Sequence, residues 1–142
     1  MRSGAHTMNL PPRPPRRHES RDITRPVEIA LNAMPGVQVW VNVTGVFCLP
    51  NSPGRVRVGL GVGGADIVGL VQCAEVSAEG MPTAHLMGRF FALELKLPSR
   101  RQSPPQAAWA AVVRAQGGFY AVARTIPEAA QAVARCREGR SE

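Results

Sequence analysis

The chain has 142 residues, 44% of them hydrophobic, which is enough for one domain with a modest core. Its net charge of +7 and pI near 10.9 indicate a polyanionic partner such as nucleic acid. No apolar run reaches the length of a membrane span and no secretory leader is visible, so we expect a cytoplasmic protein without a membrane partner. Three widely spaced cysteines, Cys48, Cys73 and Cys136, lack zinc-site spacing and are expected to be free, buried thiols.

Residues 1–24 are predicted to form a flexible basic arm in front of a domain that spans 25–142. Its prolines forbid a regular helix and its arginines make it basic: Pro11, Pro12, Pro14, Pro15, Arg13, Arg16, Arg17 and Arg21. The arm either contacts phosphates, with an affinity that falls with salt, or is a leader without function. A short amphipathic helix should follow, with Thr24 as its N-cap, Pro26 in its first turn and Pro35 at its end.

The segment 37–47 is rich in valine and is predicted to be one strand. Arg55 and Arg57 follow a turn at 51–54, where they either contact DNA backbone or hydrate an edge strand. The run 59–64 fits G-x-G-x-x-G, but a strand rather than a helix follows it, so no nucleotide cofactor is expected. We expect these glycines instead to let a DNA phosphate approach the next segment closely.

Acidic residues mark the next two apolar runs. Asp66 opens the first run, and Glu94 and Lys96 lie in the strand predicted over 90–97. A polar connection over 72–87 is expected to close a hairpin between these two strands. Alternation on a strand puts Glu94 and Lys96 on one face. Lys96 is the only lysine of a chain with 17 lysines and arginines, and a buried lysine, unlike arginine, can release its proton near neutral pH. A structural Glu–Lys ion pair at the mouth of a strand is the alternative.

Asp66 followed by Glu94-x-Lys96 is the D…E-x-K arrangement typical of PD-(D/E)xK nucleases. Two carboxylates on adjacent strands offer the hard oxygen ligands that Mg²⁺ prefers. Such a metal polarises a phosphodiester and lowers the pKa of a bound water, while a neighbouring lysine orients that water and offsets negative charge in the transition state. The three histidines are scattered and offer no rival metal centre.

The remaining chain completes an α/β pattern. Arg100 and Arg101 form a basic linker just past the proposed site and are candidates for DNA contact. Ser103-x-x-Gln106 is a capping box that should start a helix over 103–115. A strand over 119–123 and a last helix capped by Thr125 follow. The predicted order is αβββαβα, with one central mixed sheet flanked by helices.

Four blocks of sequence, in this order, resemble the stand-alone, phage-type VRR-NUC domain of the PD-(D/E)xK superfamily: GADIVGLV at 64–71, GRFFALELK at 88–96, SPPQAAW at 103–109 and GGFYAVAR at 117–124. The resemblance runs from about Pro26 to the C-terminus. It implies a restriction-endonuclease-like core and Mg²⁺- or Mn²⁺-dependent hydrolysis of DNA. One departure is Val41, where the family leads us to expect a basic residue that contacts DNA from the first strand.

The resemblance also implies roles for individual residues. The catalytic set is Asp66, Glu94, Lys96, Gln106 and Glu28, and the metal ligands are Asp66, Glu94 and the carbonyl of Leu95. We expect a deoxyribonuclease of a bacterial or phage-infected cell that acts as a homodimer on branched, Holliday-junction-like DNA, because paired nicks require two sites at a fixed spacing. The alternative is a DNA-binding or replication-partner docking module with a vestigial nuclease site.

Overall fold

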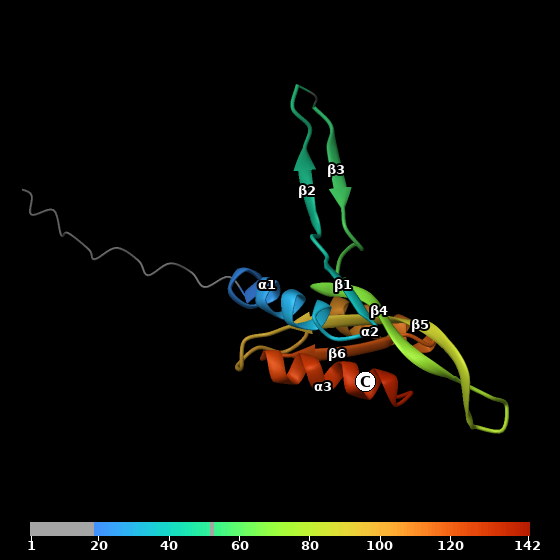
Figure 1. Cartoon of the computed structure of the whole chain (residues 1–142). Helices are drawn as coiled ribbons and strands as arrows, with labels where there is room; N and C mark the ends of the chain where they lie inside the picture. Colours follow the sequence, from blue (N-terminus) through green and yellow to red (C-terminus); the bar gives the residue numbers. More distant parts are fainter. Residues whose placement is uncertain (1–18, 52) are drawn as a thin grey trace, which may run out of the picture.

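The computed structural model describes residues 19–51 and 53–142 and is a mixed α/β fold (Figure 1). Its elements, in chain order, are α1 Glu19–Asn32, β1 Val37–Val41, β2 Gly45–Cys48, β3 Arg55–Val58, β4 Ile67–Val76, β5 Pro82–Leu95, α2 Pro104–Ala115, β6 Phe119–Ala123 and α3 Ile126–Arg137. Most of the predicted basic arm, residues 1–18, lies outside the described residues, and the rest of it belongs to α1.

Four strands form the central sheet, in the order β1-β4-β5-β6. β1 pairs with β4 and β4 with β5 in antiparallel fashion, whereas β5 and β6 are parallel. A parallel pair needs a crossover, and α2 supplies it between β5 and β6. The prediction of one central mixed sheet flanked by helices is therefore confirmed.

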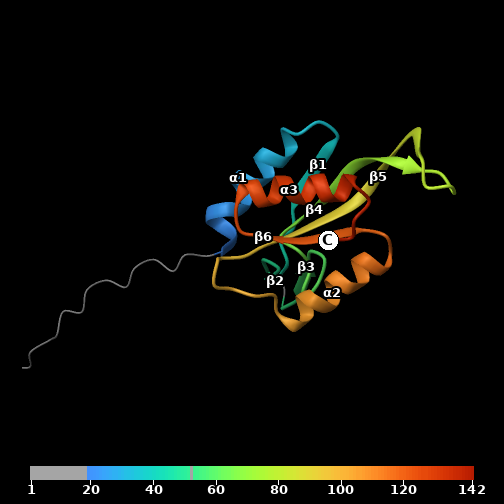
Figure 2. The same ribbon diagram turned by 90° about the horizontal axis from the view of Figure 1, so that it is seen from below.

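Helices cover both faces of this sheet, because its strands alternate between two apolar faces. The larger core lies under α1 and α3, where Leu31 and Val133 meet Ile67, Leu93 and other strand residues. Figure 2 shows α1 and α3 on one side of the sheet and α2 on the other. Under α2 lies a smaller cluster of five buried residues: Ala65, Ala92, Ala110, Val113 and Tyr120. Glu94 lies on this second face of the sheet, because side chains alternate along a strand and its neighbours Leu93 and Leu95 belong to the first core.

The predicted helix starts are right for α2 and α3 and wrong for α1. The Ser103–Gln106 capping box and the Thr125 cap are both formed. The first helix begins at Glu19, not after Thr24, and Pro26 lies in its interior rather than in its first turn. A proline there removes one intrahelical hydrogen bond, and the burial of apolar residues such as Leu31 offsets that loss.

Two strand predictions are also wrong. The segment 37–47 is not one strand, because β1 ends at Val41 and β2 begins at Gly45 in a separate sheet. Asn42 turns the chain between them: its side-chain amide donates to the carbonyl of Ala65 at 2.8 Å and accepts from the N–H of Leu60. The segment 72–87 does close a hairpin between the two strands, but most of it is strand rather than connection, because β4 and β5 pair through it and leave only a turn at 77–81. The pairing of β4 with β5 continues to Val76 and Pro82, past the last core residue of β4, Cys73.

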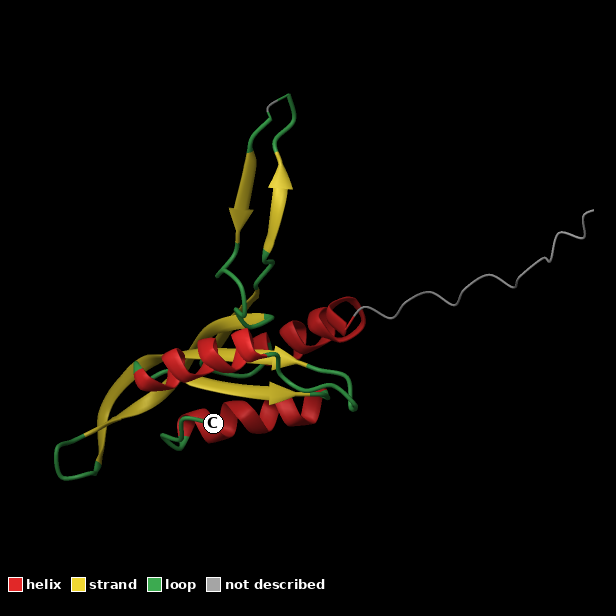
Figure 3. Cartoon of the chain, turned by 180° about the vertical axis from the view of Figure 1, so that it is seen from behind, coloured by secondary structure: helices red, strands yellow, loops and turns green. Residues whose placement is uncertain are grey.

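The pair β2–β3 is an insertion between β1 and β4 that stands away from the sheet and the helices (Figures 1 and 3). Without this hairpin, the element order is the predicted αβββαβα. Across residues 19–51 and 53–142, no helix is long and apolar enough to cross a membrane.

Candidate active site

Asp66 and Glu94 meet at one end of the β4–β5 pair. Ile67 is aligned with Leu93, so the antiparallel register brings Asp66, just before β4, beside Glu94 near the end of β5. The Asp66 carboxylate accepts a hydrogen bond from the main-chain N–H of Leu95 at 2.8 Å. The structure thus brings together two residues that lie 28 positions apart in the sequence.

Glu94 and Lys96 share one face, as the strand alternation predicts. Glu94 is 1% exposed, and its Oε1 lies 2.8 Å from Nζ of Lys96. A buried carboxylate loses the hydration that it has in water, and the nearby ammonium group offsets part of this cost. The main-chain N–H of Lys96 donates to the carbonyl of Ala123 at 3.0 Å, so β6 holds this end of β5 in place.

Gln106 joins the first turn of α2 to the carboxylate pair. Its Oε1 accepts from the N–H of Ser103 at 2.9 Å, which is half of the capping box, while its Nε2 donates to Glu94. One side chain therefore fixes the start of the helix and orients an acid of the site. The structural and the functional interpretation of Gln106 are compatible with each other.

Tyr120 lies beneath the site and was missed in the sequence. Burial raises the pKa of its hydroxyl well above the usual value, and the negative charges of Glu94 and Asp66 raise it further. The hydroxyl accepts a hydrogen bond from Nε2 of Gln102 at 2.9 Å. Tyr120 is the only tyrosine of the chain, which was the one available sequence signal. The parallel register of β5 and β6 aligns Tyr120 with Ala92, two residues before Glu94 on the same strand.

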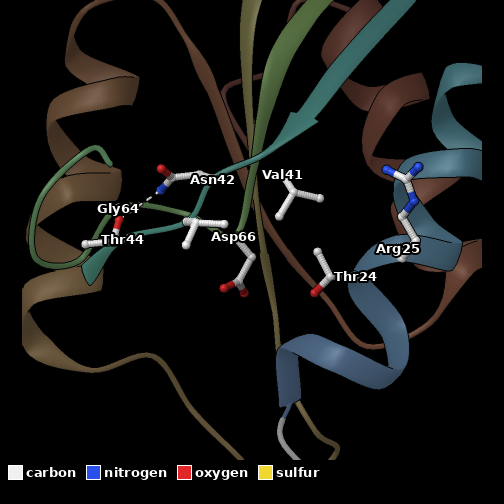
Figure 4. A pocket seen from close by; sticks show the side chains of 8 residues that line it. Thr24, Arg25, Val41, Asn42, Thr44, Gly64 and Asp66 are labelled. Carbon is white, nitrogen blue, oxygen red and sulfur yellow. Dashed lines mark hydrogen bonds between the residues drawn. The ribbon is translucent and has the colours of Figure 1, made fainter. Parts of the chain in front are cut away.

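A pocket of about 600 Å³ opens beside Asp66. Figure 4 shows Thr24 on one side of it, Asn42 and Thr44 on the other, and Asp66 between them. Asn42 also donates to the hydroxyl of Thr44 at 3.2 Å. Thr24, expected as a helix cap, is instead buried inside α1, and its hydroxyl has no hydrogen-bond partner among the described residues. The pocket therefore has polar walls that the sequence did not reveal.

Glu28 lies one turn after Thr24 on the same helix. It is 9% exposed and forms an ion pair with Arg25, whose side chain is 72% exposed and lines the pocket. Glu28, the glutamate that the family resemblance implies, therefore lies on α1, the helix that contributes Thr24 and Arg25 to the pocket. Its ion-pair partner, Arg25, belongs to the same helix.

The four arginine candidates lie in two places. Arg55 and Arg57 are on β3 of the projecting hairpin, so they stand apart from the sheet. Arg100 and Arg101 are exposed in the loop between β5 and α2, next to the Lys96 end of the site. The carbonyl of Arg100 accepts a hydrogen bond from Arg124 at 3.5 Å.

The glycine run 59–64 has a packing function. A Cβ on Gly63, whose φ is +85°, would lie 2.4 Å from the carbonyl oxygen of Pro105. A Cβ on Gly59 would lie 2.4 Å from the carbonyl oxygen of Val43. Gly59 therefore lets the two ends of the hairpin approach each other, and Gly63 lets this segment pack against the start of α2. The close approach of a DNA phosphate to these glycines stays a prediction.

The donor atoms of the site suit a hard cation. In the described part of the chain, no group of three or more His, Cys, Asp and Glu side chains gathers as a metal centre. Two carboxylates are nonetheless the number that Mg²⁺ commonly takes from a protein, with water and substrate oxygens completing its shell. Asp66 and Glu94, held side by side by strand register, fit that requirement.

Comparisons with protein-family models, with curated proteins and with solved structures gave no match.

Proposed function

We propose that this chain is a metal-dependent DNA endonuclease with a restriction-endonuclease-like PD-(D/E)xK core, of the kind found in stand-alone VRR-NUC domains. The observation that carries the proposal is the convergence of Asp66, Glu94 and Lys96 at the end of two adjacent strands, with Gln106 on Glu94. An ion pair that served only stability would not need a second carboxylate beside it.

Asp66, Glu94 and the main-chain carbonyl of Leu95 would hold Mg²⁺ or Mn²⁺. A bound ion of this kind polarises the phosphodiester and lowers the pKa of a water ligand, so that hydroxide is available near neutral pH. The contribution of the protein is to hold the two carboxylates in place, and the N–H of Leu95 and the amide of Gln106 do so.

Lys96 supplies the amine that orients or deprotonates the attacking water. Its side chain is 10% exposed and already lies against Glu94, so it needs little reorganisation to act there. Its positive charge also offsets the negative charge that develops on the phosphate. Glu28, on the neighbouring helix, is a candidate for indirect support of the metal or for a second ion.

The substrate we propose is DNA, because the chain is strongly basic and Arg100 and Arg101 are exposed in the loop that follows Lys96. Paired cleavage of a branched junction requires two active sites at a fixed spacing, which a twofold homodimer provides. We therefore propose a homodimer that acts on branched DNA in the cytoplasm of a bacterial or phage-infected cell.

Cleavage assays on a four-way junction, a flap, a single strand and a linear duplex, each with Mg²⁺ or Mn²⁺, test the proposal. Glu94→Gln removes an anionic ligand at constant volume, and Lys96→Ala removes the amine. Both are expected to lower the cleavage rate by roughly 100-fold or more, as losses of charged catalytic groups generally do. Binding of the same DNA should be largely kept.

Glu138→Gln is the matched control, because Glu138 is an exposed glutamate paired with Arg140 at the far end of α3. It should cleave like the unchanged protein. Circular dichroism and melting temperature establish that each variant is folded. If Glu94→Gln or Lys96→Ala is folded and cuts at a near-normal rate, the site is assigned wrongly. If the unchanged protein binds DNA but cuts none of the substrates, the chain is a DNA-binding module with a vestigial site.

A further inference from the structure

The pocket beside Asp66 combines polar and aliphatic walls. Besides Asp66, its polar lining residues are Thr24, Arg25, Asn42 and Thr44, and its aliphatic ones are Val41 and Val43. Its volume of about 600 Å³ lies in the range of sites that enclose a small molecule. A pocket of this composition suits a ligand with a flat apolar body and polar edges.

The hydroxyl of Thr24 points to a ligand in this pocket. Thr24 is 5% exposed, and its Oγ1 neither donates nor accepts a hydrogen bond within the described chain. Figure 4 shows this hydroxyl on the side of Thr24 that faces Asp66 across the pocket. Buried polar groups of native proteins almost always have a partner, supplied by the protein, by water or by a ligand. The partner of this hydroxyl is therefore expected among the molecules that enter the pocket.

Asn42 holds the opposite wall of the pocket in place. Its side-chain amide donates to the carbonyl of Ala65 at 2.8 Å and to Oγ1 of Thr44 at 3.2 Å, and its oxygen accepts from the N–H of Leu60 at 3.3 Å. Because the hydroxyl of Thr44 is the acceptor in this bond, it can donate its own proton to a ligand. The pocket thus offers one hydroxyl from each side.

The charges around the pocket favour a neutral group inside it. Asp66 places a carboxylate in the wall, and the guanidinium group of Arg25 is paired with Glu28. A free phosphate would therefore meet one negative charge and a positive charge that is already balanced. A nucleobase with its sugar is uncharged, and its flat faces and polar edges match aliphatic side chains and hydroxyl groups. The phosphate of the same nucleotide can stay at the mouth, where Arg25 is 72% exposed.

We propose that this pocket holds one unpaired nucleotide of the DNA strand, beside the phosphate that is cleaved. A paired base has its edge in use and is stacked in the duplex, so it can enter only after unpairing, which costs free energy. Asp66 lines the pocket and is also a proposed metal ligand, so the nucleotide would lie next to the cleaved bond. The inference rests on the proposed function and specifies what the site recognises in branched DNA, namely an unpaired nucleotide.

Binding of two DNA duplexes of the same sequence tests the proposal, one fully paired and one with a single unpaired thymidine. Fluorescence anisotropy with the Glu94→Gln variant, without divalent metal, measures affinity in the absence of cleavage. We expect this starting protein to bind the duplex with the unpaired thymidine about tenfold more tightly. Adding Thr24→Val removes one hydrogen bond at nearly constant volume. It should weaken binding of that duplex about fivefold and leave binding of the paired duplex unchanged.

Thr24→Ser and Thr83→Val, each added to the same starting protein, are the matched controls. Thr24→Ser keeps the hydroxyl and should keep the preference for the unpaired thymidine. Thr83 lies near the turn between β4 and β5 and does not line the pocket, so Thr83→Val makes the same chemical change elsewhere. It should bind both duplexes like the starting protein. Circular dichroism and melting temperature establish that each variant is folded.

Three results would overturn the proposal: a starting protein that binds the two duplexes equally or not at all, a Thr24→Val variant that keeps the full preference, or Thr24→Val and Thr24→Ser variants that lose it alike. Failure of the nuclease proposal gives a different result. A protein that shows the preference but cleaves no substrate with Mg²⁺ or Mn²⁺ keeps the nucleotide pocket and loses the nuclease. Cleavage without the preference leaves the nuclease and removes the pocket.

Discussion

Individual residues of the site serve the fold and the proposed chemistry together. Gln106 closes the capping box of α2 and also holds Glu94. Lys96 pairs with Glu94 through its side chain and with β6 through its main chain. Because the same groups do both, removing one changes stability as well as rate, and every kinetic comparison needs a stability measurement beside it.

The environment of Thr24 leads to a prediction about the stability of the fold. Its hydroxyl is buried and has no hydrogen-bond partner among the described residues. Leaving such a group unsatisfied costs about 1–3 kcal/mol, so the isosteric change Thr24→Val should raise the free energy of unfolding by about 1 kcal/mol. Chemical denaturation without added metal or DNA measures the change.

Thr125→Val is the control, since the same chemical change has the opposite consequence there. The hydroxyl of Thr125 caps α3 and accepts from the N–H of Glu128 at 3.2 Å. Losing this cap should lower the free energy of unfolding by about 1 kcal/mol. Equal destabilisation by both changes would show that the hydroxyl of Thr24 is satisfied in solution.

At the scale of elements, the close approach of β1 and β4 determines where Asp66 lies. Gly69 is the residue that permits it: a Cβ there would lie 2.1 Å from the carbonyl oxygen of Gln38 and 2.6 Å from Cα of Val39. Both are main-chain atoms of β1, which cannot move aside as a flexible side chain would. Asp66 lies three residues before Gly69, so its position depends on the close packing of β4 against β1.

Gly69→Ala is accordingly expected to destabilise the fold by about 3 kcal/mol, the upper end of the usual cost of overpacking. Gly88→Ala is the control in the partner strand β5, because its Cβ would meet nothing nearer than a side-chain carbon of Leu70 at 3.8 Å. That change should alter stability by no more than about 0.5 kcal/mol. Thermal and chemical denaturation compare the two, and similar destabilisation at both positions would contradict the close approach of β1 and β4.

At the scale of the whole molecule, positive charge is spread over the chain rather than gathered at the site. Two arginines lie on the hairpin, two lie in the loop after β5, and four more precede the described residues: Arg2, Arg13, Arg16 and Arg17. Long-range attraction of DNA depends on the sum of these charges, whereas cleavage depends on the few groups around Glu94. Affinity and catalysis can therefore be separated by mutation.

Deleting residues 1–18 tests the contribution of the four arginines that precede α1. The cut falls directly before α1, so all described elements are retained. If these arginines neutralise DNA phosphates, the plot of log affinity against log salt should become less steep by roughly 0.9 for each phosphate that is no longer neutralised. Binding measured over a salt series with the Glu94→Gln variant, which avoids cleavage, gives this slope. An unchanged slope would mean that this segment does not bind DNA.

One prediction about the thiols was wrong in part. Cys73 and Cys136 are buried, as expected, but Cys48 is exposed at the end of β2 on the projecting hairpin. Burial raises the pKa of the Cys136 thiol to about 12, so that this thiol is inert near neutral pH. The error has the same origin as the strand error over 37–47: the sequence does not show that the hairpin leaves the body of the protein.

Local signals determined much of this structure from the sequence alone. The cap at Thr125 and the capping box at Ser103 act within three residues, so the starts of α2 and α3 followed from short-range chemistry. Strand alternation put Glu94 and Lys96 on one face, and the helix predicted over 103–115 ends at Ala115 as α2 does. In each case the interaction that determines the structure lies within one element.

Only the tertiary structure decided features that depend on interactions between distant segments. Asn42 breaks the valine-rich run because its amide binds the chain near Ala65, 23 positions away. Thr24 became a buried helix residue because packing, not its capping ability, determined where α1 begins. The lengths of β4 and β5 came from pairing with each other, which periodicity in either segment does not record. Asp66 and Glu94 met for the same reason: hydrogen bonds between strands determine register, and register is a property of two segments.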